Sequence, residues 1–474
     1  MAVLNSHTRG PGHWNKHAYR ELFYDYIILK RVGRAAPPQL RGVLYYRGMP
    51  YKYHTARDGN DEVVDRPVHL IRFGDERLKI AYFSPLNPIK SGVSDYSEEL
   101  LEYLAGFGRI ELFIDDYDPS STWLYDYFDI HNYRRIYENH GKNDHDINIY
   151  HVGNNDSHSY IYSVCLEHPG LVVLHEPILH HFVFSQTVGN NRVREYLREL
   201  DYCYKGMRSK IVKLTLEDRD ENSWYEYPLA DRIIDCSMGV IVHSEFAREK
   251  VLEINPLARV RRIPHHYSPP PADHMRSPEL LREVLGFKDD EFVIGSLGYM
   301  TASKRIDILL KTIASIKKKG HKVKLLLVGR MMPGCEALRW IDQYGLFEDV
   351  IVTGYVDTHT FREYLYIPDI FVVLRHPSAG ETSGSVIKMM GTGSPVVVSD
   401  HYAFSELPDD CCIKVPIGED EEEELERKLI YYIENEEERR AIGARSQQYI
   451  MMNHDIQNSA RSYIEFAEEV LAGS

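Results

Sequence analysis

Short apolar runs alternate with longer amphipathic stretches along most of the chain, and each run has the length of a β-strand. In the first half these runs are 78–83, 110–114, 147–150, 170–174, 239–243 and 260–263. A second series consists of 292–297, 324–328, 350–353, 370–374 and 396–398. Strands that alternate with helical stretches form parallel sheets covered by helices, so the pattern predicts an α/β fold.

The two series are separated by the sequence HHYSPPPAD at 265–273. Consecutive prolines make a stiff spacer, which suits a hinge between two rigid lobes. A chain of 474 residues is also too long for one core. We therefore predict an N-terminal extension, a first lobe, a second lobe and a C-terminal helix, at 1–76, 77–268, 269–445 and 446–474.

The N-terminal extension differs in charge from the rest of the chain. Residues 1–57 contain ten Lys or Arg and two acidic residues, although the whole chain has a net charge of −15. Residues 19–32 (YRELFYDYIILKRV) predict an amphipathic helix with basic residues at its C-terminal end. Such a helix can lie on an anionic membrane surface, or it can dock on its own domain or on a partner subunit. Both interpretations stay open.

Composition narrows the class of protein. The acidic balance argues against a nucleic-acid partner. No apolar run is long enough to span a bilayer, and the first residues lack the apolar segment of a secretion signal. The six cysteines lack paired metal-ligand spacing and are expected to be reduced. These observations predict a cytoplasmic globular protein without a bound metal.

The stretch 369–400 contains the clearest candidate site. It is predicted to form a buried strand, a Gly/Ser-rich loop at 380–385, a helix and a second strand, which is a parallel crossover. Ligands bind where such a strand ends and the helix begins. The N–H groups of a helix start favour a phosphate, and Glu381 can accept hydrogen bonds from hydroxyls. The loop therefore predicts a site for a phosphorylated sugar, with Thr382, Ser383, Gly384 and Ser385 at the helix start.

Other strand ends add charged and flexible groups. Lys304 and Arg305 follow the strand 292–297 and precede a helix, and two cations there suit a diphosphate leaving group. Ser91 and Gly92 begin another helix and let the backbone approach a ligand, but the GxGxxG pattern of dinucleotide folds is absent.

Two patterns raise the question of a metal. Asp116-x-Asp118 is a carboxylate pair that a hard cation can use, although acidic residues after a strand are common in turns. His180-His181 lacks the spacing and carboxylate of HExxH. We interpret the aspartates as turn residues and the histidines as structural or acceptor-side residues.

Several of these segments together resemble a known family. GETSG at 380–384, PVVVSD at 395–400 and SELPDD at 405–410 are similar to the donor-binding region of family-4 glycosyltransferases, in particular a bacterial subgroup with a GETSG loop. GNN at 153–155 and HPGLVVLH at 168–175 are similar to further segments of that subgroup. The resemblance runs from about Lys79 to the C-terminus. It implies the GT-B architecture: two Rossmann-like parallel-sheet lobes facing a central cleft, with the last helix returning to the first lobe.

The resemblance also implies roles for individual residues. His175 contacts the donor sugar, Glu381 holds its hydroxyls, and Lys304 binds the diphosphate. Further donor contacts are expected from Ser91, Gly92, Tyr299, Tyr355, Val356, Thr382, Ser383, Gly384, Ser385 and Lys388, and acceptor-side contacts from Asn154, Asn155, His180 and His181.

The chain departs from the family pattern in two places. Where a second glutamate binds the ribose, this sequence has Met389, with Lys388 next to it. Where an arginine precedes the lysine by five residues, it has Tyr299, so Arg305 is expected to compensate.

The resemblance implies a retaining, metal-independent hexosyltransferase that moves a sugar from a nucleotide sugar, UDP- or GDP-linked, to a hydroxyl of a glycan, lipid or protein. Attack takes place on the face that the diphosphate leaves. The alternative is a non-catalytic glycosyltransferase-like subunit that binds a partner or acceptor. A metal-dependent GT-A enzyme is a third, weaker hypothesis that depends on Asp116 and Asp118.

Overall fold

The computed structural model describes residues 44–46, 49–51, 77–138, 144–220, 222–269 and 275–473. The chain divides into two compact units, Met1–Leu70 and Ile71–Ser474. In the first unit, strand β1 (Leu44–Tyr46) pairs with β2 (Met49–Tyr51) in antiparallel register. The helix predicted at 19–32, and with it the membrane or partner contact, lies outside the described residues.

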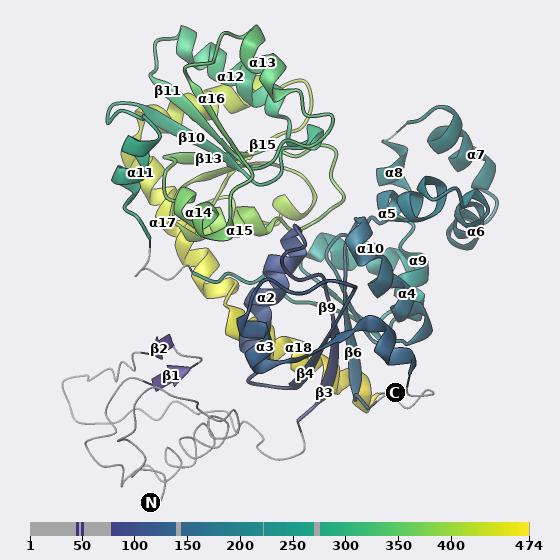
Figure 1. Cartoon of the computed structure of the whole chain (residues 1–474). Coiled ribbons are helices and arrows are strands. Elements are labelled where there is room, and N and C mark those ends of the chain that lie inside the picture. Colours follow the sequence, from purple (N-terminus) through teal and green to yellow (C-terminus); the bar gives the residue numbers. More distant parts are fainter. Residues whose placement is uncertain are drawn as a thin grey trace, which may run out of the picture. The chain divides into compact units, whose positions relative to one another are not determined.

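The second unit begins with a lobe built on a seven-stranded parallel sheet in the order β5-β4-β3-β6-β7-β8-β9 (Figure 1). All residues of its strands β6, β7 and β8 are buried, as expected for strands covered by helices on both faces. The strands are β3 (Lys79–Phe83), β4 (Arg109–Ile114), β5 (Asp129–Asn132), β6 (Ile147–Val152), β7 (Leu171–Leu174), β8 (Gly239–Val242) and β9 (Val260–Arg262).

Helices of the first lobe connect these strands as crossovers. They are α2 (Gly92–Leu104), α3 (Trp123–Tyr127), α4 (Ser159–Glu167), α9 (Asp231–Cys236) and α10 (Glu245–Ile254). The helix α2 begins at Ser91, whose Oγ accepts a hydrogen bond from Val93 N at 3.2 Å and so caps a free donor of the first turn.

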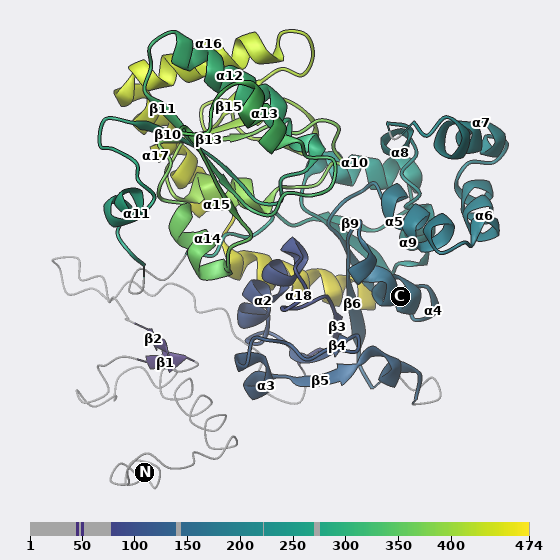
Figure 2. The same ribbon diagram turned by 45° about the horizontal axis from the view of Figure 1, so that its top comes forward.

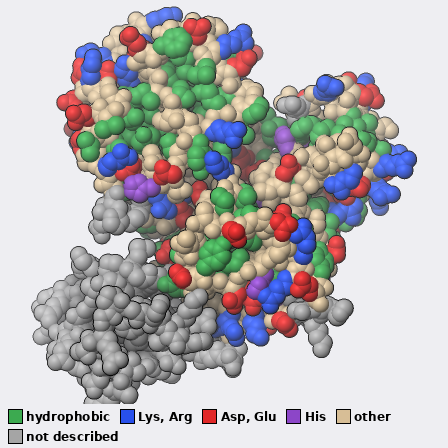
Figure 3. All heavy atoms as spheres, viewed as in Figure 1, with side chains coloured by type: hydrophobic (Ala, Val, Ile, Leu, Met, Phe, Trp, Pro, Cys, Tyr) green, Lys and Arg blue, Asp and Glu red, His purple; other side chains and the backbone are tan. Residues whose placement is uncertain are grey.

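A helical insertion lies between β7 and β8. It contains α5 (His180–Phe184), α6 (Val193–Cys203), α7 (Arg208–Val212) and α8 (Ser223–Glu226), with its own small core around Tyr196, Leu200 and Ile211. The insertion projects beside the sheet in both ribbon views (Figures 1 and 2). Lys and Arg side chains are visible over α6 and α7 in the space-filling view (Figure 3).

The second lobe contains a six-stranded parallel sheet in the order β12-β11-β10-β13-β14-β15. Its strands are β10 (Phe292–Leu297), β11 (Val323–Val328), β12 (Val350–Gly354), β13 (Ile370–Val373), β14 (Val396–Ser399) and β15 (Ile413–Val415). Its helices are α11 (Pro278–Val284), α12 (Ile306–Lys318), α13 (Ala337–Gln343), α14 (Thr358–Tyr364), α15 (Gly384–Gly391), α16 (Glu421–Glu434) and α17 (Glu436–Asn453).

The last helix, α18 (Ile456–Ala472), leaves the second lobe and packs on the first (Figure 2). Its residues Ile456, Tyr463 and Val470 belong to the same core cluster as Ile80 of β3. The hydroxyls of Tyr463 and Tyr96 share a hydrogen bond of 2.8 Å. The chain therefore crosses between the lobes twice, once near 264–269 and once near 453–456.

The predicted α/β architecture of two parallel-sheet lobes is confirmed. The sequence did not predict β1 and β2 of the first unit, nor β5 and β15, which lie at edges of the two parallel sheets. An edge strand is covered less completely than a central one, so it lacks a long apolar run. No helix among the described residues combines the length and the apolar character required to cross a bilayer.

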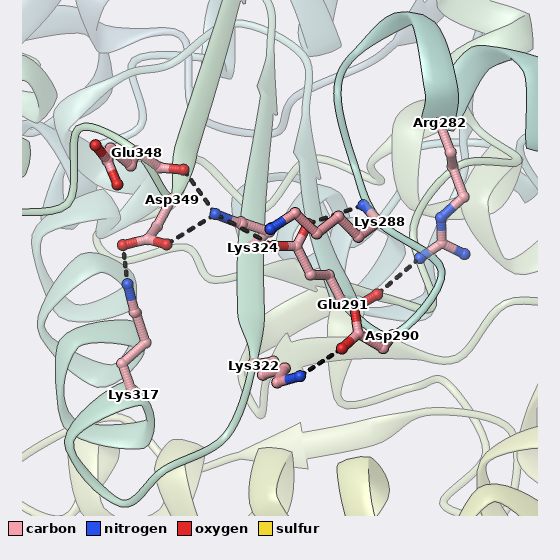
Figure 4. Close-up of polar contacts among 9 residues, drawn as sticks. All are labelled: Arg282, Lys288, Asp290, Glu291, Lys317, Lys322, Lys324, Glu348 and Asp349. Atoms are coloured by element: carbon pink, nitrogen blue, oxygen red, sulfur yellow. Dashed lines mark hydrogen bonds and ion pairs between the residues drawn. The ribbon is translucent and has the colours of Figure 1, made fainter.

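The edge of the second sheet where its strands begin is tied together by ion pairs (Figure 4). Lys324 Nζ lies 3.0 Å from Asp349 Oδ1 and 3.5 Å from Glu291 Oε1, and Lys317 pairs with the same aspartate. The side chains of Asp349 and Glu291 are only 9% and 10% exposed. These ion pairs lie at the beginnings of the strands, opposite the strand ends where ligands bind in parallel sheets. We therefore assign them a stabilising role within the second lobe.

We expect Lys324→Met to lower the free energy of unfolding by about 1–3 kcal/mol, because two nearly buried carboxylates lose a charged donor. Lys322→Met is the matched control, since Lys322 and its partner Asp290 are 69% and 58% exposed. Urea unfolding monitored by circular dichroism measures both variants, and equal midpoints for Lys324→Met and wild type would contradict the prediction.

Candidate functional site

The loops at the strand ends of the two sheets contact one another. Tyr299, after β10, donates a hydrogen bond of 3.0 Å to the carbonyl oxygen of Lys90, after β3. The ammonium of Lys90 lies 4.0 Å from the centre of the Tyr355 ring, after β12. Glu406 of the second lobe accepts hydrogen bonds from the N–H groups of Glu245 and Phe246, which begin α10 of the first lobe. Ligand-binding edges of both lobes therefore meet.

The Gly/Ser-rich loop starts α15 as predicted, and its glycines fit tightly against the first lobe. Ser383 is the N-cap, with its Oγ accepting from Val386 N at 3.4 Å. Gly380 has a φ of 79°, and a Cβ there would lie 2.3 Å from the Phe246 ring. A Cβ on Gly384 would lie 2.7 Å from His265 Nε2. Both positions accept no side chain, so glycine is required for the close approach of the lobes.

Lys304 lies beside the start of α15. Its side chain is 4% exposed, and Nζ donates to the carbonyl oxygen of Leu297 at 2.5 Å. A Cβ on Gly298 would lie 3.0 Å from this Nζ and 3.9 Å from Ser385 Oγ, so both polar groups border the same glycine. Burial, followed by the charge of Arg375, lowers the pKa of Lys304 to about 7. An anion at this place would restore its full positive charge.

Glu381 is held by two side chains. Its Oε1 forms an ion pair with Nη1 of Arg375, and its Oε2 accepts from Ser378 Oγ at 2.9 Å. The prediction that Glu381 lies at the strand end beside the helix start fits this geometry, and its role toward sugar hydroxyls stays a prediction. Arg375 was not predicted as a site residue, although its place directly after the buried strand 370–374 was a usable signal.

Arg305 has a structural partner. Its guanidinium pairs with Glu421, the first residue of α16, whose side chain is 1% exposed. Its backbone has a φ of 54°, in the left-handed region. The expectation that Arg305 replaces a missing arginine at the diphosphate is therefore weakened, because its charge already balances a buried carboxylate.

His175 lies at the end of β7, where the sequence placed it. One ring nitrogen, Nε2, shares a hydrogen bond of 3.0 Å with His151 Nδ1, and the ring packs edge-on against Tyr96. Burial and the neighbouring His243 and His151 lower the pKa of His175 well below its ordinary value. The imidazole is thus neutral near pH 7 and can exchange hydrogen bonds with hydroxyls without adding charge.

Glu176 follows His175 in the sequence, and its carboxyl group is close enough to Arg375 for the guanidinium charge to act on it. Burial raises the pKa of Glu176 to about 7, although the charge of Arg375 opposes this rise. A residue of the first lobe is therefore in electrostatic contact with the second. Glu176, Arg375, Glu381 and Lys304 are called the charged cluster below.

Of the four residues expected on the acceptor side, Asn154 and His181 lie next to each other, whereas His180 and Asn155 have structural partners. Asn154 accepts a hydrogen bond from Phe182 N at 2.8 Å and lies 3.4 Å from His181 Nδ1, so these two are neighbours. His180 is fully buried, and its ring nitrogens bond Tyr227 O and Tyr196 Oη. No ring nitrogen of His180 is left for an acceptor, and this residue anchors the helical insertion. Asn155 caps the turn 156–158 through a hydrogen bond from Ser157 N.

The two departures from the family pattern have structural explanations. Lys388 points to the first lobe, where its Nζ lies 2.8 Å from Glu99 Oε1 on α2. Met389 is fully buried in the core of the second lobe. Tyr299 bonds the Lys90 carbonyl, as described above. Lys388 and Tyr299 thus join the lobes, and their predicted part in donor binding is untested.

Among the described residues no group of three or more His, Cys, Asp or Glu side chains is arranged to hold a metal ion. Asp116 accepts hydrogen bonds from Asn132 Nδ2 and Arg134 Nη1 at 2.6 and 2.8 Å, which fits the interpretation of this segment as a turn.

The second lobe is similar to a known protein family. Residues 278–449 match the family described as Glycosyl transferases group 1. An uncharacterized glycosyltransferase of Methanocaldococcus jannaschii is 31% identical over 129 residues, which are 27% of this chain and 32% of that protein. The matched part is thus about a third of the relative's length.

Solved structures extend the likeness to both lobes. A glycosyltransferase from Rickettsia africae has a TM-score of 0.60 at 14% identity and covers 84% of this chain and 100% of its own. Sucrose-phosphate synthase from Thermosynechococcus elongatus has a TM-score of 0.58 at 18% identity, covering 84% and 100%. Anabaena HepE, solved in complex with UDP and glucose, has a TM-score of 0.55 at 14% identity, covering 83% and 100%. At these identities the likeness shows the fold, and the fold is GT-B.

Proposed function

We propose that this protein is a retaining family-4 glycosyltransferase of the GETSG subgroup, which transfers a hexose from a UDP- or GDP-sugar to an acceptor hydroxyl without a metal ion. The observation that carries the proposal is the convergence of Lys304, the start of α15 and the Arg375–Glu381 pair at the strand ends of the second lobe. Glu176 approaches Arg375 from the first lobe, and His175 precedes it at the end of β7. The group 1 match covers this second lobe, and HepE shows the same fold with UDP and glucose.

In the proposed reaction each polar group has one task. Lys304 and the N–H groups of α15 neutralise the diphosphate as the bond between the anomeric carbon and the phosphate oxygen breaks. Glu381 orients sugar hydroxyls, and the neutral His175 hydrogen-bonds the sugar from the other lobe. The acceptor oxygen bonds the anomeric carbon on the face that the diphosphate leaves, and the departing phosphate oxygen takes its proton. Configuration at the anomeric carbon is thereby retained.

The test is incubation of the purified chain with a panel of UDP- and GDP-sugars and measurement of nucleoside diphosphate release, with and without excess EDTA. We expect release from one donor, undiminished by EDTA, and a product anomer identical to that of the donor by NMR. Absence of both release and binding for every donor would refute the enzyme proposal. Release that EDTA abolishes would refute metal independence. The GT-A hypothesis based on Asp116 and Asp118 is wrong, because the chain folds into two parallel-sheet lobes of the GT-B type.

A non-catalytic subunit is the second candidate, and the observation that favours it is the use of Tyr299 and Lys388 in contacts between the lobes. Such a subunit would bind an acceptor or partner but would release no diphosphate from any nucleotide sugar. The release measurement therefore decides between the two. The cytoplasmic location expected from the sequence stays a prediction.

A further inference from the structure

The charged cluster contains a cation that the proposed reaction does not yet use. A nucleoside diphosphate brings at least two negative charges, and Lys304 supplies a single positive one. Arg305 pairs with Glu421, although its Nε is also buried without a partner among the described residues. Tyr299 is uncharged. Arg375 is the remaining basic side chain whose charge acts directly on Lys304.

Arg375 is fixed in place from both ends. Its backbone N–H donates to the hydroxyl of Ser399 at 2.9 Å, and Ser399 is fully buried at the end of β14. Its side chain is 18% exposed, and Nη1 pairs with Glu381. The guanidinium is therefore held at the ends of two central strands, β13 and β14, at the edge where ligands bind in parallel sheets.

One edge of this guanidinium is unsatisfied. Nε is buried and has no hydrogen-bond partner among the described residues. A buried guanidinium N–H without a partner is costly, and phosphate oxygens satisfy the planar fork well. Lys304 likewise has one hydrogen bond, to Leu297 O, for an ammonium with three donors. Arg375 and Lys304 thus each keep an N–H donor that no described residue accepts.

We propose that Arg375 is a donor-binding residue of this chain: its Nε edge binds the nucleoside diphosphate together with Lys304, while its Nη1 holds Glu381 toward the sugar. This inference rests on the proposed function and adds to it a second phosphate-binding cation. One guanidinium then links the phosphate half of the donor to the sugar half. A residue that only positioned Glu381 would affect sugar binding and leave the diphosphate untouched.

The experiment measures binding of UDP and GDP, without sugar, by calorimetry to the full-length wild type, Arg375→Gln, Arg375→Lys and Glu381→Gln. For the nucleotide that wild type binds, we expect Arg375→Gln to weaken affinity by about 30- to 100-fold. Arg375→Lys should recover part of that loss, since it keeps the charge but not the fork. Glu381→Gln should bind the free diphosphate about as well as wild type.

Two further proteins complete the design. Arg282→Gln is the matched control, because Arg282 pairs with Asp369 at 2.8 Å, is 27% exposed, and lies at the opposite edge of the sheet. Arg375→Gln/Glu381→Gln removes both charges of the pair, so its affinity can be measured even if the single change unfolds the chain. We expect the double variant to bind the diphosphate as weakly as Arg375→Gln.

Two outcomes overturn the inference. Affinity of Arg375→Gln, or of the double variant, within twofold of wild type would show that Arg375 does not touch the diphosphate. An equal loss in Glu381→Gln and Arg375→Gln would show that Arg375 acts through Glu381 alone. Either result leaves the proposed function standing, because wild type would still bind and turn over its donor. Failure of wild type to bind any nucleotide or nucleotide sugar would instead refute the proposed function, and the inference with it.

Discussion

Lys304→Met should lower turnover by about 10²–10³-fold, since in the proposed reaction it removes the buried charge that neutralises the departing diphosphate. The lysine is nearly inaccessible and lies beside the start of α15, so water cannot replace its ammonium. Substrate binding should weaken less than turnover, because the diphosphate gains charge as the glycosidic bond breaks. Diphosphate release under single-turnover conditions measures the effect. Unchanged release would mean that Lys304 is only a core residue.

The lowered pKa of Lys304 allows a second test of its role in diphosphate binding, through the protons taken up on binding. At about 7 it lies below the ordinary lysine value, so the free protein holds the ammonium mostly charged at pH 6 and mostly neutral at pH 8. A bound diphosphate favours the charged form. Binding at pH 8 should therefore take up about one proton, and affinity should fall as pH rises from 6 to 9.

Calorimetry in buffers of different ionisation enthalpy measures this uptake. Glu176, whose pKa is also raised to about 7, can take up a proton when an anion arrives. The measurement therefore needs Glu176→Gln beside Lys304→Met. We expect Lys304→Met to lose most of the uptake and Glu176→Gln to keep it. Equal uptake in Lys304→Met and wild type would assign the proton elsewhere.

The sequence was informative about the fold wherever the signal was local. Buried central strands such as 147–150 and 370–374 are continuous apolar runs, and the structure places strands there. The loop at 380–385 was found because glycines and a helix start follow such a run directly. The strand β5 was missed because none of its residues is buried, and β15 because it has only three residues with a lysine at the centre.

Contacts between the lobes could not be predicted in the same way. Glu406 was noted only as part of a motif, and its place at the first turn of α10 depends on how two separately folded sheets meet. Arg375 and Glu381 are only six residues apart in the sequence. Their inferred part in donor binding, however, depends on the nearby charges of Lys304 and of Glu176 from the other lobe. Lys388 was judged only as a poor match to a glutamate. Its partner is 289 residues away and had no signal in the sequence.

Glu99, the partner of Lys388, is expected to contribute strongly to the stability of the chain. Its side chain on α2 is 9% exposed and receives Lys388 at 2.8 Å and Arg362 at 3.1 Å, both from the second lobe. His266 Nε2 lies 3.5 Å away. Although burial opposes it, the charges of Lys388 and His266 lower the pKa of Glu99 well below its ordinary value. One carboxylate therefore balances cations from the other lobe.

We expect Glu99→Gln to lower the free energy of unfolding by about 2–4 kcal/mol, because Lys388, whose side chain is only 15% exposed, loses its counter-charge. Lys388→Met should cost less, since Glu99 keeps Arg362 and His266. The double variant should be more stable than the sum of the single changes predicts, by a coupling energy of about 1–3 kcal/mol. Arg339→Ala is the control, because Arg339 and its partner Glu336 are 66% and 54% exposed and should contribute nothing measurable.

Denaturant unfolding of the four variants and wild type, monitored by fluorescence and by circular dichroism, provides the measurement. If the ion pairs join the lobes, Glu99→Gln should also separate the two probes into distinct transitions, because the lobes would then unfold independently. Additive effects of Glu99→Gln and Lys388→Met would show that the pair is not coupled. In that case Lys388, which lies next to the position of the expected glutamate, would have no structural explanation, and its predicted role in donor binding would become the better hypothesis.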